Sequence, residues 1–110
     1  MTHTDLDLAI IPPAKLRDYL LSPLHPIGRY KSAFFLDLGY SQESWQVLER
    51  DLRAVLRGEV KVLDVTEFGQ KLAARGQLRG PTGRAAGVVA IWIVLTGEST
   101  PRFVTAYPED

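Results

Sequence analysis

The sequence predicts an α+β fold, with N-terminal helices packed on a three- to four-stranded antiparallel meander sheet. Three observations lead to this prediction. Apolar residues recur at helical spacing within 13–57, apolar runs of strand type follow within 59–107, and turns rich in glycine and proline separate those runs. All helices precede all strands, which favours α+β over alternating βαβ units. The length of 110 residues fits a single domain, 1–110.

The chain begins with a polar stretch that becomes apolar, and we expect residues 1–11 to form a frayed start. A short helix follows Pro13, because proline suits a first helical turn and Leu16, Tyr19 and Leu20 recur at helical spacing. A serine–proline pair then ends this helix, since the residue before a proline disfavours the helical conformation.

The second predicted helix contains two departures from helix rules. It starts near Pro26 and ends before Gly39, which suits the residue after a helix. Lys31 falls inside its apolar arc, so the ammonium must either extend to water or find a partner. Gly28, in the first turn, costs about 1 kcal/mol relative to alanine unless something approaches the backbone there. Such departures collect at functional sites.

A third helix, with one apolar stripe, begins after Ser41 and ends at Gly58. The apolar run after the GPTG turn suits a central strand covered on both faces. We assign Trp45 and Trp92 to the core. The predicted strands are 70–78 (the weakest pattern), 85–95 and 102–107, and 59–65 is the fourth strand of the four-stranded alternative.

Composition limits the classes of function. The chain has no cysteine and two histidines, His3 and His25, so we expect neither a metal site nor a cofactor. It has no run of about 20 apolar residues and no signal sequence, so we expect a cytoplasmic protein without membrane contact.

The formal net charge of zero argues against a general nucleic-acid-binding surface. Charge is nonetheless unevenly distributed, because Glu98 is the one acidic residue between Gly69 and Tyr107. This excess of basic residues indicates either a local positive face or charged strands that protect the sheet edges.

Four segments of the chain carry a resemblance to a known family: KLRDYLLSPLHPIGRYKSAFF, LGYSQESWQVLERDL, LRGPTGRAAGVVAIWIV and PRFVTAYP. From about Ala14 to Pro108 the chain resembles a bacterial family of unknown function with HPxGRxKAxFF, GPxGR and TAYP segments. Ser32 departs from that pattern, since the family often has alanine directly after the lysine. Such domains occur beside small proteins of antitoxin type and at the ends of larger toxins.

The family's layout is similar to that of the barnase–EndoU–colicin–RelE ribonucleases, a likeness at the level of the fold. The resemblance therefore implies a ribonuclease of toxin type, with RNA and a small cognate antitoxin or immunity protein as partners. Cleavage of RNA without a metal needs a base for the 2′-hydroxyl, an acid for the leaving oxygen and positive charge for the phosphorane.

Three residues of the HPIGRYK segment are candidates for this chemistry. His25 is either a proton shuttle or a residue that caps and orients the turn before Pro26. Lys31 either stabilises the developing charge or extends to water, and Arg29 is either a phosphate contact beside the helix N-terminus or a solvated surface residue.

The remaining candidates belong to the predicted sheet. Phe103, Thr105 and Tyr107 alternate onto one face of the last strand, where a hydroxyl and a ring could position RNA. These residue types are also ordinary strand formers. Arg84, after the GPTG turn, is either a phosphate anchor or simply exposed.

We therefore expect a metal-independent endoribonuclease of toxin type, with His25, Lys31, Thr105 and Tyr107 as catalytic residues and Arg29 and Arg84 as substrate contacts. The alternative, from another class, is a non-catalytic interaction module or a partner protein of antitoxin or immunity type. The oligomeric state is left open at this stage.

Overall fold

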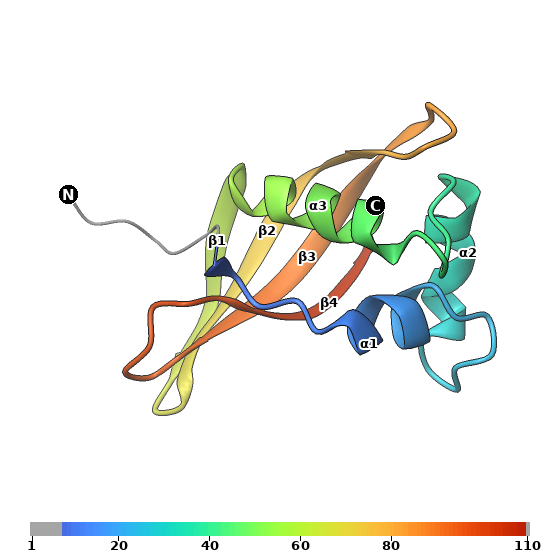
Figure 1. Ribbon diagram of the computed structural model, residues 1–110. Helices are drawn as coiled ribbons and strands as arrows, with labels where there is room; N and C mark the ends of the chain where they lie inside the picture. The colour runs from blue at the N-terminus through green and yellow to red at the C-terminus, as the bar shows by residue number, and fades with distance from the viewer. Residues whose placement is uncertain (1–7, 110) are drawn as a thin grey trace.

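The computed structural model describes residues 8–109, apart from the side chain of Tyr30, and confirms the predicted fold class (Figure 1). Helices precede a four-stranded antiparallel meander with strand order β1-β2-β3-β4. The helical elements are α1 (Pro13–Lys15), the π-helical turn η2 (Leu16–Leu20), α2 (Arg29–Asp37) and α3 (Trp45–Leu56). The strands are β1 (Glu59–Thr66), β2 (Gly69–Arg79), β3 (Ala85–Leu95) and β4 (Arg102–Pro108).

The helices end where the sequence places turn residues. Gly39 follows α2 with a φ of 101°, a conformation that glycine adopts without steric cost. α3 carries the apolar stripe expected of a helix that packs on a sheet, and its buried residues are Leu48, Leu52, Val55 and Leu56. Within residues 8–109, no helix has the length and apolar character needed to cross a membrane.

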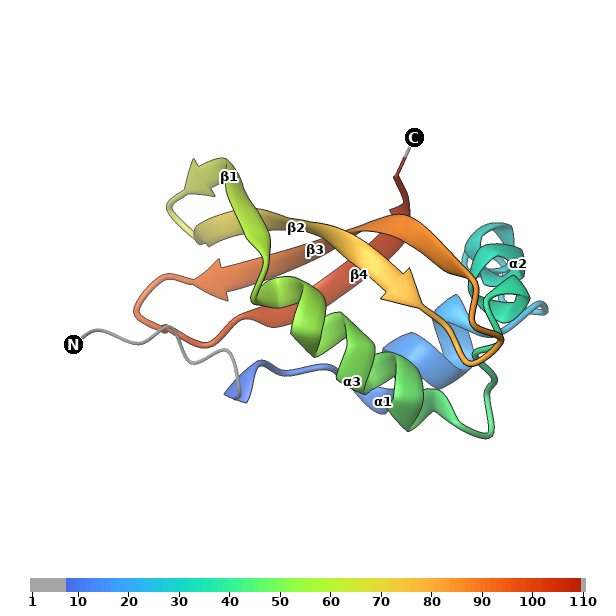
Figure 2. The same cartoon turned by 90° about the horizontal axis from the view of Figure 1, so that it is seen from above.

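The main core lies between the helices and one face of the sheet, as Figure 2 shows. Trp92 is fully buried there, against Phe103, and Trp45 packs on the edge of this core. On the opposite face, Ala73, Val89 and Ile91 form a small buried cluster with Val104. The described helices thus cover one face of β3, whereas its apolar run led us to expect cover on both.

A bulge in β4 interrupts the regular alternation of side chains that we predicted for the last strand. Phe103 lies opposite Trp92, but Thr105 lies opposite Ile91, so Val104 is an extra residue. Phe103 therefore points into the main core, at 3% exposure, while Thr105 falls on the side of Ile91. Thr105 and Tyr107 lie opposite Ile91 and Val89 and share a face as predicted, whereas Phe103 points to the other face.

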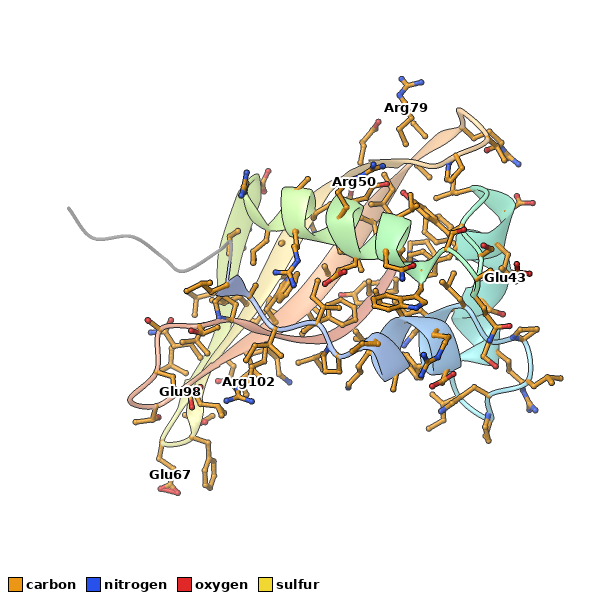
Figure 3. The ribbon with its side chains drawn as sticks, viewed as in Figure 1. Glu43, Arg50, Glu67, Arg79, Glu98 and Arg102 are labelled. Atoms are coloured by element: carbon orange, nitrogen blue, oxygen red, sulfur yellow. The ribbon has the colours of Figure 1, made fainter. Side chains whose placement is uncertain are left out.

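The outer edge of β4 is covered by the segment that precedes α1. Ile10 forms a parallel bridge to Arg102, accepts a hydrogen bond from the N–H of Phe103 (2.8 Å) and donates one to Pro101 (2.8 Å). Arg102 also forms a salt bridge with Glu98 (3.2 Å; Figure 3). Of the stretch 1–11 expected to fray, residues 1–7, with His3, lie outside the described part, whereas Ile11 is buried.

Candidate functional site

Three polar side chains from separate elements meet at the outer edge of β4. Lys31 of α2 donates hydrogen bonds from Nζ to Tyr19 Oη of η2 (2.9 Å) and to Thr105 Oγ1 of β4 (3.1 Å). The two oxygens lie 3.4 Å apart and share a further hydrogen bond. All three side chains are half-buried, so the cluster is both ordered and reachable from solvent. Lys31, which the sequence places in the apolar arc of its helix, thus has two hydrogen-bond partners.

The positive charge of Lys31 is not neutralised by a neighbouring acid. No salt bridge in the described part of the chain involves Lys31, and both of its side-chain partners are neutral hydroxyls. A second ammonium lies near the same edge, where Lys15 Nζ donates to the Val104 carbonyl (3.1 Å). An ammonium held by hydroxyls retains the ability to attract an anion.

The lysines also act on the Tyr19 phenol. Burial alone would raise the pKa of Tyr19, but hydrogen bonds with Lys31 and Thr105 and the charges of Lys31 and Lys15 outweigh it. The pKa of Tyr19 therefore lies below its ordinary value. Tyr19 is the one member of the cluster whose oxygen can hold or release a proton near a fixed positive charge.

His25 lies beside Tyr19 but is oriented by the backbone. Its ring meets the Tyr19 ring edge to face, with centroids 5.1 Å apart. Its Nδ1 accepts hydrogen bonds from the N–H groups of Ile27 (3.0 Å) and Gly28 (2.9 Å). The proton of the neutral ring is therefore on Nε2, which can donate a hydrogen bond but cannot accept a proton in this tautomer. The capping role is thus present, and this conformation disfavours His25 as a base.

Gly28 allows η2 and α2 to approach closely enough to form the cluster. A Cβ at this position would lie 2.0 Å from the Tyr19 carbonyl oxygen and 2.6 Å from its carbonyl carbon. No side chain fits against backbone at that distance, which explains the glycine in a helical first turn. Gly28, unfavourable in a helix by itself, is therefore required for the position of Tyr19.

Several backbone N–H groups at the start of α2 already have partners within the chain. The N–H groups of Ile27 and Gly28 are bound by His25 Nδ1, and the N–H of Arg29 donates to the His25 carbonyl (3.1 Å). An anion at this place would therefore be bound by side chains, above all Lys31.

The other predicted site residues lie elsewhere on β4, on α2 and in the turn before β3. Tyr107 follows Thr105 by two residues on β4 and is 39% exposed. Arg29 is exposed at the first position of α2, which places it on another side of the helix from Lys31. Arg84 forms a salt bridge with Asp37 (3.0 Å) at the far end of α2.

Tyr19 is the residue that sequence reasoning missed. Its spacing with Leu16 and Leu20 led us to interpret it as part of an apolar stripe, and Leu16 and Leu20 are indeed buried. The available signal was chemical, because a half-buried tyrosine needs a partner for its hydroxyl. The three residues of the cluster are separated by 12 and 74 positions, so spacing could not join them.

Comparison with protein families assigns the chain to one of them. Residues 3–110 match the family described as "Domain of unknown function (DUF6883)", and the chain belongs to this family. No protein with a curated description matches the chain.

Comparison with solved structures shows the fold. One similar chain comes from a structure described as "Contact-dependent growth inhibition toxin - immunity protein complex from Klebsiella pneumoniae 342". Its TM-score is 0.71 at 15% sequence identity, and the match covers 98% of this chain and 99% of that chain. The two chains share their architecture over nearly their full lengths.

Proposed function

We propose that this chain is an endoribonuclease of toxin type that cleaves RNA without a metal ion. The observation that carries the proposal is the Lys31 ammonium, bound by two hydroxyls and by no carboxylate in the described residues. A phosphodiester needs such a charge where its transition state becomes more negative. The fold shared with a chain from a toxin–immunity complex supports the proposal at the level of architecture.

In this reaction the 2′-oxygen of a nucleotide bonds to the adjacent phosphorus, and the bond from phosphorus to the 5′-oxygen breaks. The phenolate form of Tyr19, stabilised by Lys31, accepts the proton of the 2′-hydroxyl. Lys31 supports the phosphorane and supplies a proton to the leaving 5′-oxygen. The proton then returns from Tyr19 to Lys31 across their 2.9 Å hydrogen bond. The products are a 2′,3′-cyclic phosphate and a 5′-hydroxyl.

Three further residues have supporting roles in the proposal. Thr105 orients the ammonium, and His25 can donate from Nε2 to a phosphate oxygen. The ring of Tyr107, an exposed residue farther along β4, offers a surface on which a base can stack.

The test is incubation of the purified protein with total RNA in EDTA. We expect cleavage by the wild type and a loss of about 10²–10³ in rate for Lys31→Ala, because one stabilising charge is removed. Lys71→Ala is the matched control, since it removes an exposed lysine of β2. A requirement for divalent metal, or 3′-hydroxyl products, would contradict the mechanism.

A non-catalytic partner protein of immunity or antitoxin type is the second candidate. The net charge of zero and the exposed apolar residues of the β1–β2 hairpin favour it. Intact RNA with the wild type, together with harmless expression in bacteria, would favour this candidate. Toxic expression that Lys31→Ala relieves would favour the enzyme.

A further inference from the structure

The outer edge of β1 is open along its whole length. All eight of its residues are exposed, and within the described residues its backbone hydrogen bonds go to β2 alone. Its apolar side chains are unusually accessible, at 53% for Val62, 51% for Leu63 and 64% for Val65. An exposed apolar edge strand is a template for pairing with another strand.

The register with β2 places the side chains of β1 on two faces. Residues directly opposite each other in an antiparallel pair share a face. Val60 and Val62 lie opposite Ala74 and Leu72, which belong to the helix-covered face. Lys61 lies opposite Ala73, on the other face.

A bulge changes this alternation in the middle of β1. Leu63 is the extra residue, because the pairing passes from Val62 to Asp64. Asp64 then lies opposite Lys71, so Asp64 and Lys61 share the face away from the helices although they are three residues apart. Neither of them forms a salt bridge among residues 8–109.

We propose that β1 pairs antiparallel with β1 of a second copy of this chain, about a two-fold axis between Val62 and Leu63. The two sheets then form one sheet of eight strands. In this register Lys61 of each copy lies opposite Asp64 of the other, and Val60 lies opposite Val65. The faces agree along the strand because each copy carries the bulge.

Neighbouring registers are less favourable. A shift by one residue brings side chains of opposite faces together. A shift by two in one direction places Glu59 opposite Asp64 of the other copy, which is repulsive. The opposite shift by two leaves Lys61 facing Thr66 and loses the charge pairs. The charges of β1 are thus complementary to those of β1 in a second copy only in the proposed register.

This pairing leaves the candidate site accessible. β4 is the other edge of the sheet, so the two Tyr19–Lys31–Thr105 clusters would lie at the two ends of the combined sheet. The dimer therefore does not depend on the proposed ribonuclease activity, and each proposal can fail without the other.

The test uses charge reversal and sedimentation velocity over a range that reaches roughly 0.5 mM protein, since one strand pair is a small interface. The wild type should sediment as a dimer at the upper end. Lys61→Asp and Asp64→Lys should each raise the dissociation constant about tenfold or more, because both charge pairs become repulsive. A mixture of these two variants should dimerise again, since each charge then meets its opposite.

Glu67→Lys is the control. This substitution also reverses a charge, but at the tip of the β1–β2 hairpin, outside the paired strand (Figure 3). This variant should dimerise like the wild type. A wild type that remains monomeric throughout would overturn the proposal and assign Lys61 and the bulge to edge protection. Charge-reversal variants that dimerise as well as the wild type would overturn it too, since another surface would then be responsible.

Discussion

The two edge strands of the sheet have opposite surroundings. β4 is bridged by Ile10, its Val104 carbonyl binds Lys15, and its Thr105 hydroxyl binds Lys31 and Tyr19. β1 contacts β2 on one side and is exposed along its full length. Every sheet edge presents unpaired backbone groups, and this chain covers one edge while leaving the other open.

The difference assigns different roles to the two edges. Covering β4 brings cationic and hydroxyl side chains from distant parts of the chain to one place, where burial strengthens their interactions. β1 has a bulge and charges but no cover, and it retains the ability to pair. The covered edge is therefore the candidate for chemistry and the open edge the candidate for association.

The largest effect should come from adding a side-chain atom at Gly28, where η2 and α2 are in close contact beside the covered edge. In Gly28→Ala the new Cβ must displace the backbone of Tyr19, so we expect a loss of about 1–3 kcal/mol in unfolding free energy, measured with urea. RNA cleavage should fall with it. Gly58→Ala, beside the open edge, is the control, because its Cβ has no neighbour nearer than 3.4 Å. Equal stability of the two variants would contradict the close approach.

A smaller effect should follow from removal of the Tyr19 hydroxyl. Tyr19→Phe should lower stability by about 1 kcal/mol at neutral pH, through the lost hydrogen bonds. In an ultraviolet titration of phenolate, the wild type should ionise one tyrosine earlier than Tyr19→Phe does. The Tyr40 phenol should ionise late, since burial and its hydrogen bond to Asp51 (2.7 Å) raise its pKa.

The lowered pKa of Tyr19 also predicts a sign for the dependence of stability on pH. The folded protein releases this proton at lower pH than the unfolded chain does, so ionisation favours the folded state. This contribution appears as pH rises through the folded pKa and is complete above the ordinary pKa of tyrosine. The stability difference between wild type and Tyr19→Phe should therefore widen in alkaline buffer, and a narrowing would contradict the assignment.

The smallest effect should occur at the open edge. Val62→Thr removes apolar character from a side chain that is 53% exposed, so monomer stability should change by no more than about 0.5 kcal/mol. Urea unfolding at low protein concentration measures this, with Val88→Thr in the fully buried centre of β3 as the contrasting variant. A loss as large as that of Val88→Thr would show that β1 is covered in solution.

The order and type of the elements followed from the sequence, because helical and strand spacing are local properties. The three helical regions, the turns at Gly39 and Gly58, and a meander of three to four strands were predicted; the structure has four strands, and the fold class is confirmed. Lys31 and Gly28 were also singled out correctly as unusual, since each breaks a local rule that needs no knowledge of the fold.

The tertiary structure alone decided which residues meet and which surfaces stay open. Tyr19 became a member of the site because η2 and α2 approach at Gly28, and the bulge at Val104 separated Phe103 from Thr105. The Lys31–Thr105 contact spans 74 positions, so it depends on how the helices pack around the edge of β4. Sequence spacing reports on neighbours along the chain, whereas burial, partners and proton affinity depend on neighbours in space.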